Sequence, residues 1–383
     1  MTTRVQFGVA LEVLQHRQHQ PRRVRRRGVL TVFLLIFLFI SILMMMLVLN
    51  WIWLVLHNRD MQRRSDVLAL SAAVELLDDG LLEDKVLDQS DDVIDAESAV
   101  AIFRDFNNQV AAATLFLEPG NVTVTPGRVD SVEDCLFVKT EPYNALRINL
   151  HRYASGPNPA RFLFRGFGAL ETADVKTASV AALDSRVIGF WPTDQVSSPL
   201  VPLAIAITAW TNDRISDVNS NGRFELEATL KLSIGDASAN AALVDFDEKN
   251  PVNTSIMPVQ ITAGVSPSHL ANSMFGPATL SVALPVPATQ KSPPNTNAIV
   301  DAVNEVAVSS DARRIFPLYD DVFSDPLQII GFVAARVLGA ANTGGVSNQL
   351  SVTVEPTFIV HMTVVTDPAE SENKYIHKLR LVQ

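Results

Sequence analysis

The sequence has little of what most catalytic or metal-binding proteins need. Cys135 is the single cysteine among 383 residues, which excludes an intrachain disulfide framework and any CxxC metal or redox site. The sequence also has no GxxxxGK[ST] phosphate loop, HExxH helix, GxSxG elbow or GxGxxG turn. Its seven histidines are scattered, without the spacing of metal ligands. We therefore expect a protein that is not an enzyme and holds no cofactor, apart from the weak calcium candidate described below.

Charge is missing from a long stretch near the N-terminus. No Asp, Glu, Lys or Arg occurs from Gly28 to Leu56, and the run VLTVFLLIFLFISILMMMLVL is almost wholly apolar. At about 1.5 Å per residue, a helix from Val29 to Asn50 spans roughly 33 Å, enough to cross a hydrocarbon core of about 30 Å. A cleaved secretory signal has a shorter apolar run, followed directly by small residues. We therefore predict a transmembrane helix over residues 28–56 that stays as an anchor.

Basic residues are concentrated on one side of this segment. Of the net charge of −10, residues 1–27 carry +6, which leaves −16 for the remainder. Because basic flanks stay in the cytoplasm, we predict a basic cytoplasmic tail over residues 1–27 and an outer region that, in a bacterium, is periplasmic. The acidic remainder argues against nucleic-acid binding, which needs clustered Lys and Arg. The arginines expected to set the orientation are Arg22, Arg23, Arg25, Arg26 and Arg27.

The outer end of the apolar segment has side chains suited to a membrane interface. Trp51 and Trp53, with Asn50 and His57 nearby, fit an interfacial belt of amphipathic rings. The charged collar HNRDMQRR follows without Gly or Pro, so we expect a juxtamembrane helix over 57–82, with Gly80 as its stop. Apolar residues then recur at helical spacing, which predicts a stripe that packs on the protein's own domain or, as an alternative, on another helix. The stripe comprises Val67, Leu70, Val74, Leu77 and Leu81.

The order of these segments resembles a known family. Arg26-Arg27-Gly28, a long apolar run and then NRDMQRRSDVLALSAA are similar to the N-terminus of the TadE/TadG-like family of Flp-pilus (tight-adherence) assembly proteins. Later blocks resemble the longer TadG-like members of planctomycete type, so that the resemblance covers nearly the whole chain. These blocks are NALRINLHR (144–152), DVKTASVAALDSRVIGFWP (174–192) and RIFPLYDD with IIGFVAARVLGA (within 314–341).

The chain departs from the family pattern in two places. The helix after the collar has Val67, Leu68 and Val74 where the family favours Ala, so its packing partner is expected to differ. Phe33 stands at the fifth position after Gly28, where prepilin processing usually requires Glu. We therefore expect the anchor to be retained rather than cleaved.

The resemblance implies a function and partners. It implies a non-enzymatic assembly or scaffold component of a Flp-type pilus system, anchored by a single pass in the bacterial inner membrane. Its partners would be the lipid bilayer and other pilus-assembly membrane proteins or pilin-like helices. The alternative is a membrane-anchored extracytoplasmic binding module unrelated to pili, and an anchored hydrolase is a third possibility that would need converging carboxylates or a Ser-His pair.

The region outside the membrane is expected to be α+β, over residues 83–383, as one domain or as two subdomains at 95–200 and 201–383. Asp95 is a candidate cap for a helix through Ala113, with Ala99, Phe103, Phe106 and Val110 on one face. Residues 144–152 alternate, which predicts a half-covered strand with Leu146, Ile148 and Leu150 facing the core.

Further elements follow from local patterns. Strands are predicted near 174–188, 201–209, 224–234, 278–284, 327–338 and 349–365, the last broken by Pro356. A short helix is predicted within 160–168, a Pro-rich surface loop over Pro285–Asn297 and a second short helix over Ala298–Val306. His361 is expected to be a half-buried histidine with a hydrogen-bond partner.

One stretch suggests a metal ligand set. DVNSNGRFE (217–225) places Asp217, Asn219, Asn221 and Glu225 at positions 1, 3, 5 and 9 of an EF-hand-like loop. Ala228 occupies the twelfth position, where the bidentate carboxylate is needed, so a hairpin turn rich in Asx and Gly is the simpler interpretation. A weak calcium contact of the millimolar class is the hypothesis that remains.

Overall fold

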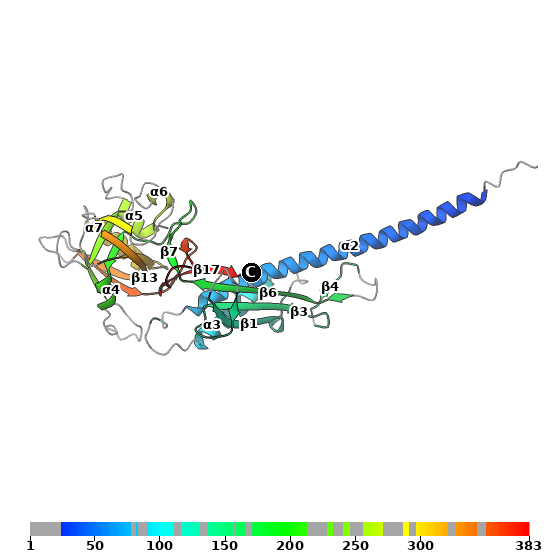
Figure 1. The fold of residues 1–383 in the computed structure, drawn as a ribbon, viewed down its shortest axis with the longest axis horizontal. Helices are drawn as coiled ribbons and strands as arrows, with labels where there is room; N and C mark the ends of the chain where they lie inside the picture. Colours follow the sequence, from blue (N-terminus) through cyan, green and yellow to red (C-terminus); the bar gives the residue numbers. More distant parts are fainter. Residues whose placement is uncertain are drawn as a thin grey trace, which may run out of the picture. The chain divides into compact units, whose positions relative to one another are not determined.

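The structure is a computed structural model, and it confirms a mixed α+β chain with a long apolar N-terminal helix followed by several β-sheets (Figure 1). The chain divides into two compact units, residues 1–60 with 152–175 and residues 61–151 with 176–383. The structure describes residues 24–77, 82, 90–110, 116–130, 136–156, 158–164, 171–212, 228–232, 240–245, 256–270, 286–290, 296–320, 327–342 and 350–382.

The first unit consists of most of helix α2 (Val24–Ala73) and a two-stranded ribbon of β4 (Ala160–Arg161) and β5 (Thr172–Ala173). Helix α2 runs through the charged collar without a break, because the sequence has neither Gly nor Pro between residues 29 and 73. A 3₁₀ turn, η1 (Val74–Leu76), follows and Leu77 is extended. The helix therefore ends before the predicted residue 82, while Gly80 lies outside the described residues.

The second unit contains a six-stranded sheet in the order β15-β17-β6-β3-β1-β2. Strand β3 alternates as predicted, since Leu146, Ile148 and Leu150 are buried and Arg147 is exposed. The strands of this sheet are β1 (Val122–Val129), β2 (Phe137–Val138), β3 (Ala145–Arg152), β6 (Val175–Asp184), β15 (Ile359–Val360) and β17 (Ile376–Val382).

The last turns of α2, from Met61 onward, pack against this sheet. Ser65 Oγ donates to the carbonyl of Ile148 on β3 (3.3 Å), and Gln62 Nε2 donates to Ser179 Oγ on β6 (2.9 Å). Small side chains let the helix approach the strands closely. The buried side chains on this helical face, continued by η1, are Met61, Ser65, Leu68, Ala69, Ala72, Ala73 and Leu76.

This buried face differs from the predicted stripe. Val67 is 48% exposed, and Leu70, Val74 and Leu77 are only partly buried, while Leu81 lies outside the described residues. The buried face combines Ala69, Ala72 and Ala73, whose small side chains allow close approach to the strands, with the larger Met61, Leu68 and Leu76, which the predicted stripe did not include. The stripe expected to pack on the domain is therefore not the buried one.

A seven-stranded sheet in the order β11-β10-β8-β12-β13-β14-β9 forms the centre of the main core. Helix α7 (Thr296–Ala307) packs on β13, and α5 (Ile256–Ala263) packs on α7. Phe316 and Tyr319 on β12 are fully buried in this core. The strands are β8 (Leu203–Ala206), β9 (Ala228–Leu232), β10 (Ala241–Asp245), β11 (Val286–Gln290), β12 (Arg313–Tyr319), β13 (Leu327–Asn342) and β14 (Leu350–Pro356).

Shorter elements complete the described part of the chain. Strands β7 (Val187–Phe190) and β16 (Val364–Thr366) form an antiparallel pair. The remaining helical elements are α3 (Ser90–Val110), η4 (Pro119–Asn121), α4 (Ile207–Asn212) and α6 (Pro267–Leu270).

Several local predictions need correction. Helix α3 begins before Asp95. Of the predicted stripe, Ala99 is buried but Phe103 and Phe106 are exposed, and the helix instead buries Ala96 and Val100 beside Ala99. These buried residues are small, so the packed face of α3 is the one that lets the helix backbone come closest to its neighbours, and not the one with the largest side chains.

Other corrections concern element type. The described residues 158–164 form β4 and a bend instead of a helix, and the strand predicted to Ala209 ends at Ala206, where α4 follows. Strand β11 lies inside the segment predicted as a Pro-rich loop, because its pairing with β10 and β13 outweighs the local proline signal. Strand β14 does end at Pro356, and the strand predicted at 278–284 lies outside the described residues.

Candidate functional site

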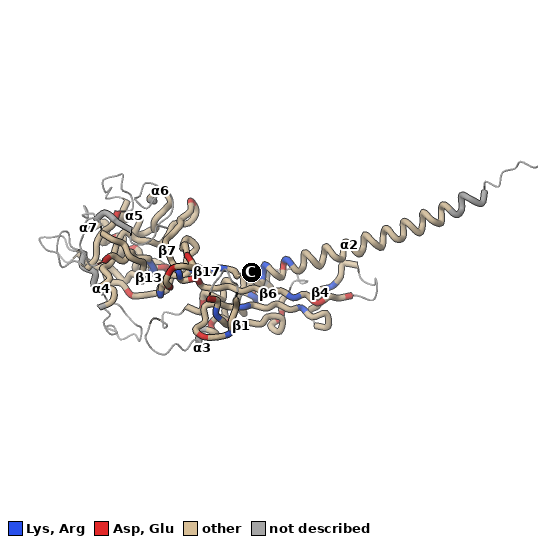
Figure 2. Tube along the Cα trace, in the orientation of Figure 1, with Lys and Arg blue, Asp and Glu red and all other residues tan. Residues whose placement is uncertain are grey.

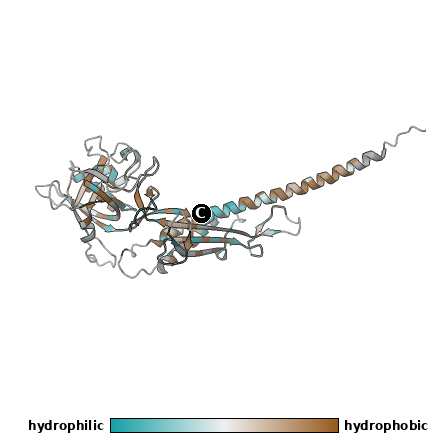
Figure 3. Cartoon of the chain, viewed as in Figure 1, coloured by the Kyte–Doolittle hydropathy of each residue, from teal (hydrophilic) through white to brown (hydrophobic). Residues whose placement is uncertain are grey.

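The apolar part of α2 presents its side chains outward. None of residues 30–56 is buried, and the segment Leu30–Leu76 is long and apolar enough to cross a membrane. Figure 3 shows the hydrophobic colour continuing along this helix until the hydrophilic collar. Figure 2 shows no acidic or basic residue on the same described stretch before that collar. A surface of this kind is stable in lipid and costly in water.

Three polar side chains at the outer end of this stretch share one helical face. Asn50, Trp53 and His57 are separated by three and four residues, so they lie above one another. We call Asn158–Phe164 together with Glu171–Ala173 the collar hairpin; it contains β4 and β5. The Asn50 amide makes two hydrogen bonds to the backbone of Phe164, donating to its carbonyl (3.2 Å) and accepting from its N–H (2.9 Å). Trp53 Nε1 donates to the carbonyl of Arg161 (3.0 Å).

Arg152 completes this set of contacts. Its Nη1 lies 2.6 Å from His57 Nε2, and because a guanidinium has only donors, Nε2 accepts and the neutral ring carries its proton on Nδ1. Arg152 Nε donates to the carbonyl of Asn158 (2.9 Å) and Nη2 to Asn158 Oδ1 (2.7 Å). The guanidinium thus joins the helix to the start of the collar hairpin.

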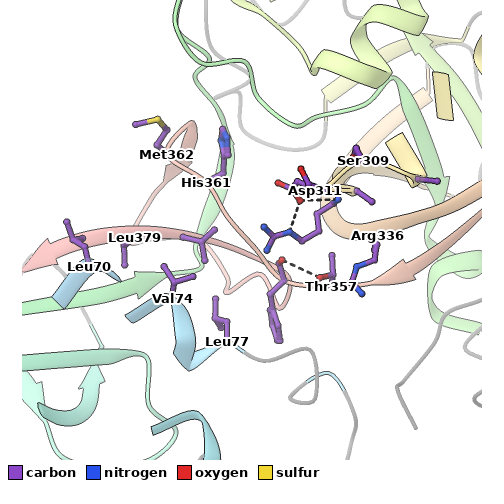
Figure 4. A pocket seen from close by; sticks show the side chains of 16 residues that line it. Leu70, Val74, Leu77, Ser309, Asp311, Arg336, Thr357, His361, Met362 and Leu379 are labelled. Carbon is purple, nitrogen blue, oxygen red and sulfur yellow. Dashed lines mark hydrogen bonds and ion pairs between the residues drawn. The ribbon is translucent and has the colours of Figure 1, made fainter. Parts of the chain in front are cut away.

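A groove of about 830 Å³ lies within the second unit (Figure 4). One wall is apolar and is formed by Leu70 of α2, Val74 of η1, Leu77 after it, and Leu379 of β17. The opposite side comes from residues 307 and 309–313, from Arg336 of β13, and from residues 357, 358 and 360–362. Met362 is 71% exposed at this groove. Three residues of the predicted stripe therefore border this groove, and of these Leu77 also packs against the main core.

The polar residues of the groove hold one another in place. Arg313 Nε donates to Asp311 Oδ1 (2.9 Å). Burial raises the pKa of Asp311, but the hydrogen bonds and positive charge of Arg313 outweigh this effect and hold the pKa below its usual value. Burial lowers the pKa of His361, whose Nδ1 lies 2.8 Å from Thr363 Oγ1. The prediction of a half-buried, hydrogen-bonded His361 is confirmed. The groove offers a ligand an apolar wall facing a mixed polar wall.

The remaining predicted site residues are placed as follows. Trp51 is 70% exposed, whereas Trp53 binds the collar hairpin. Arg25, Arg26 and Arg27 lie in the first turns of α2, but the structure does not describe their side chains. Arg22 and Arg23 lie outside the described residues. The calcium candidate, residues 217–225, also lies outside the described residues. Among those that the structure describes, no three His, Cys, Asp or Glu side chains gather to hold a metal ion.

Sequence reasoning missed the collar hairpin and Arg152. The three-and-four spacing of Asn50, Trp53 and His57 was the available signal, since polar groups on one face of an apolar helix need partners. Their partners are mostly backbone atoms more than a hundred residues away, which no side-chain pattern identifies.

Comparison with known proteins gives no relative. No family model matches the chain, and neither a curated protein nor a solved structure does.

Proposed function

We propose that the protein is a single-pass membrane protein that acts outside the membrane as a non-enzymatic assembly scaffold. The observation that carries this proposal is the exposed apolar surface of α2 from Leu30 to Leu56, in a helix that continues unbroken to Ala73. The arginine-rich N-terminal tail is on the cytoplasmic side, and the acidic folded region is on the other, periplasmic side of a bacterial inner membrane.

The scaffold role draws on the sequence resemblance and on the groove. The order of arginines, apolar helix, collar and small-residue helix resembles the TadE/TadG-like proteins of Flp-type pili. The groove supplies a surface for a partner segment, because Leu70, Val74 and Leu77 leave an apolar wall beside hydrogen-bonding groups. Pilin-like helices or other membrane components of the pilus machine are the proposed partners.

Deletion of the coding sequence in the source organism tests this role. We expect surface pili to be lost and to return with the wild-type chain but not with a secreted version in which a cleavable signal replaces residues 1–56. Crosslinking in membranes should join the protein to inner-membrane pilus-assembly components. Normal pili after a clean deletion would rule out the pilus role while leaving the membrane anchor in place.

A second candidate is a membrane-anchored binding module with no role in pili, and the groove is the observation that favours it. Met362→Asp places a charge at the groove on an exposed residue. Val259→Asp is the matched control, because Val259 is an exposed residue of α5 outside the groove lining. If only Met362→Asp abolishes piliation, the groove serves assembly. If pili are unaffected but retention of an envelope ligand is lost, the binding-module function is correct.

A further inference from the structure

The collar hairpin exposes apolar side chains at an unusual place. Leu163 is 52% exposed, and Phe162 and Phe164 beside it are partly exposed, on a ribbon of only two short strands. Arg161 precedes them and is exposed. An isolated ribbon of this size has no core in which to bury three large apolar residues, so they need another apolar surface.

The position of the hairpin along α2 shows which surface is available. A rise of about 1.5 Å per residue puts Asn50 about 30 Å from Leu30 along the helix axis, which equals the thickness of a hydrocarbon core. The backbone of Phe164 is hydrogen-bonded to Asn50, and that of Arg161 to Trp53. The hairpin is therefore held beside residues 50–53, in the last part of the apolar stretch that ends at Leu56, and Figure 1 shows β4 alongside α2.

The hydrogen bonds suit a partly dehydrated environment. An unpaired peptide group is strongly unfavourable in a lipid-like medium, where water cannot satisfy it. Here both backbone polar groups of Phe164 are satisfied by the uncharged amide of Asn50, and the N–H of Phe162 donates to the carbonyl of Glu171 (3.1 Å). The segment can approach lipid without leaving these groups unpaired.

We propose that Phe162, Leu163 and Phe164 form a second membrane contact, which enters the interfacial layer of the leaflet at the outer end of the apolar stretch of α2. The partner is the lipid surface itself, with Arg161 at the level of the phosphates, where a guanidinium is attracted to anionic headgroups. This inference rests on the proposed membrane anchoring. It gives the protein a fixed height and rotation at the bilayer, since the hairpin contacts one face of the helix only.

Site-specific fluorescence tests the contact in the full-length chain. A Cys135→Ser background receives a single cysteine, Leu163→Cys or the control Ser155→Cys, which is exposed in the turn after β3. Each is labelled with an environment-sensitive fluorophore and reconstituted in vesicles of phosphatidylethanolamine and phosphatidylglycerol. We expect the label at 163 to shift to shorter wavelength, to be quenched by nitroxide lipids and to be protected from aqueous iodide. The label at 155 should behave in the opposite way.

Asn50→Ala provides the structural arm, with Asn58→Ala on the same helix as its matched control because Asn58 is exposed. Asn50→Ala should reduce lipid quenching at 163 several-fold while the chain stays in the vesicles, and Asn58→Ala should not. Vesicle-bound protein whose 163 label is as open to iodide as the 155 label would overturn the hairpin contact but not the anchor. Protein that does not remain with the vesicles would overturn both.

Discussion

Arg152 is the largest fully buried side chain among the described residues, at 1% exposed. A buried guanidinium is tolerated only when its donors are satisfied. Here its partners are His57 on the helix and the backbone and side chain of Asn158 at the start of the collar hairpin. Arg152, at the end of β3, therefore holds the start of the hairpin to α2, alongside the hydrogen bonds of Asn50 and Trp53.

Replacing Arg152 with Met should loosen the collar hairpin. Arg152→Met keeps most of the volume but leaves buried acceptors without donors, which costs about 1–3 kcal/mol. Hydrogen exchange of the amides in β4 and β5 of the full chain in detergent should accelerate by about 5- to 150-fold accordingly. Arg147→Met on the exposed face of the same strand is the control, and equal exchange in the two variants would refute the role of Arg152.

His377 makes the folded region sensitive to acid. Burial lowers its pKa from 6.5 to about 4, and its ring lies 5.7 Å from that of Phe358. As the pH falls from 6.5 to 4, His377 therefore takes up a proton in the unfolded chain but not in the folded chain. The free energy of unfolding decreases by about 3 kcal/mol over this pH range. Burial raises the pKa of Asp184, but hydrogen bonds from Arg186 and Thr366 outweigh it and hold that pKa below its usual value of 3.8. Protonation of Asp184 in the unfolded chain therefore lowers the free energy of unfolding further as the pH falls below 3.8.

The variant His377→Leu should remove most of the loss between pH 6.5 and 4. Denaturant unfolding of wild type and variant at pH 7.5 and pH 5 measures the difference, with the higher pH as the internal reference. An equal drop in unfolding free energy for both proteins would show that His377 is not the group responsible.

At the scale of elements, a single glycine determines how α5 ends. Gly264 has φ of +80°, and its N–H donates to the carbonyl of Gln260 (3.0 Å) at the helix C-terminus. A Cβ at this position would lie 2.2 Å from the carbonyl oxygen of Ser198. Only glycine fits such a left-handed residue in direct contact with a neighbouring backbone.

Gly264→Ala should therefore destabilise the second unit by more than about 1–2 kcal/mol, through both backbone strain and the clash. Gly120→Ala is the matched control, because nothing lies within 4 Å of its added Cβ, and its effect should stay within about 0.5 kcal/mol. Thermal unfolding of the two variants provides the measurement. Similar melting temperatures would contradict the tight turn described at Gly264.

Elements with one dominant signal were predictable from sequence, and elements decided by packing were not. Strand β3 alternates because one face is covered, and α7 shows helical spacing over its whole length, so both were found. The packed faces of α2 and α3 were missed because Ala69, Ala72 and Ala96 carry a weak hydrophobic signal but allow close approach. Strand β11 was missed because Pro287 within it and Pro285 before it suggest a loop, whereas β10 and β13 pair with it.

At the scale of the whole molecule, the sequence contains a strong division of charge and hydropathy. An arginine-rich tail, an uncharged helix and an acidic folded region follow one another along the chain. This order predicted the long apolar helix, which the structure confirms, because span length and charge bias depend on local composition alone. The collar hairpin and the groove join distant segments, so composition could not reveal them.

Cysteine accessibility in intact cells tests the central claim most directly. In a Cys135→Ser background, a single cysteine at exposed Ser371 is compared with one at Thr3 in the N-terminal tail. A membrane-impermeant maleimide should label position 371 once the outer membrane is permeabilised, and position 3 only after the inner membrane is opened, with all protein in the membrane fraction. Labelling of position 3 before position 371, or recovery of the full-length protein in the soluble fraction, would contradict the account.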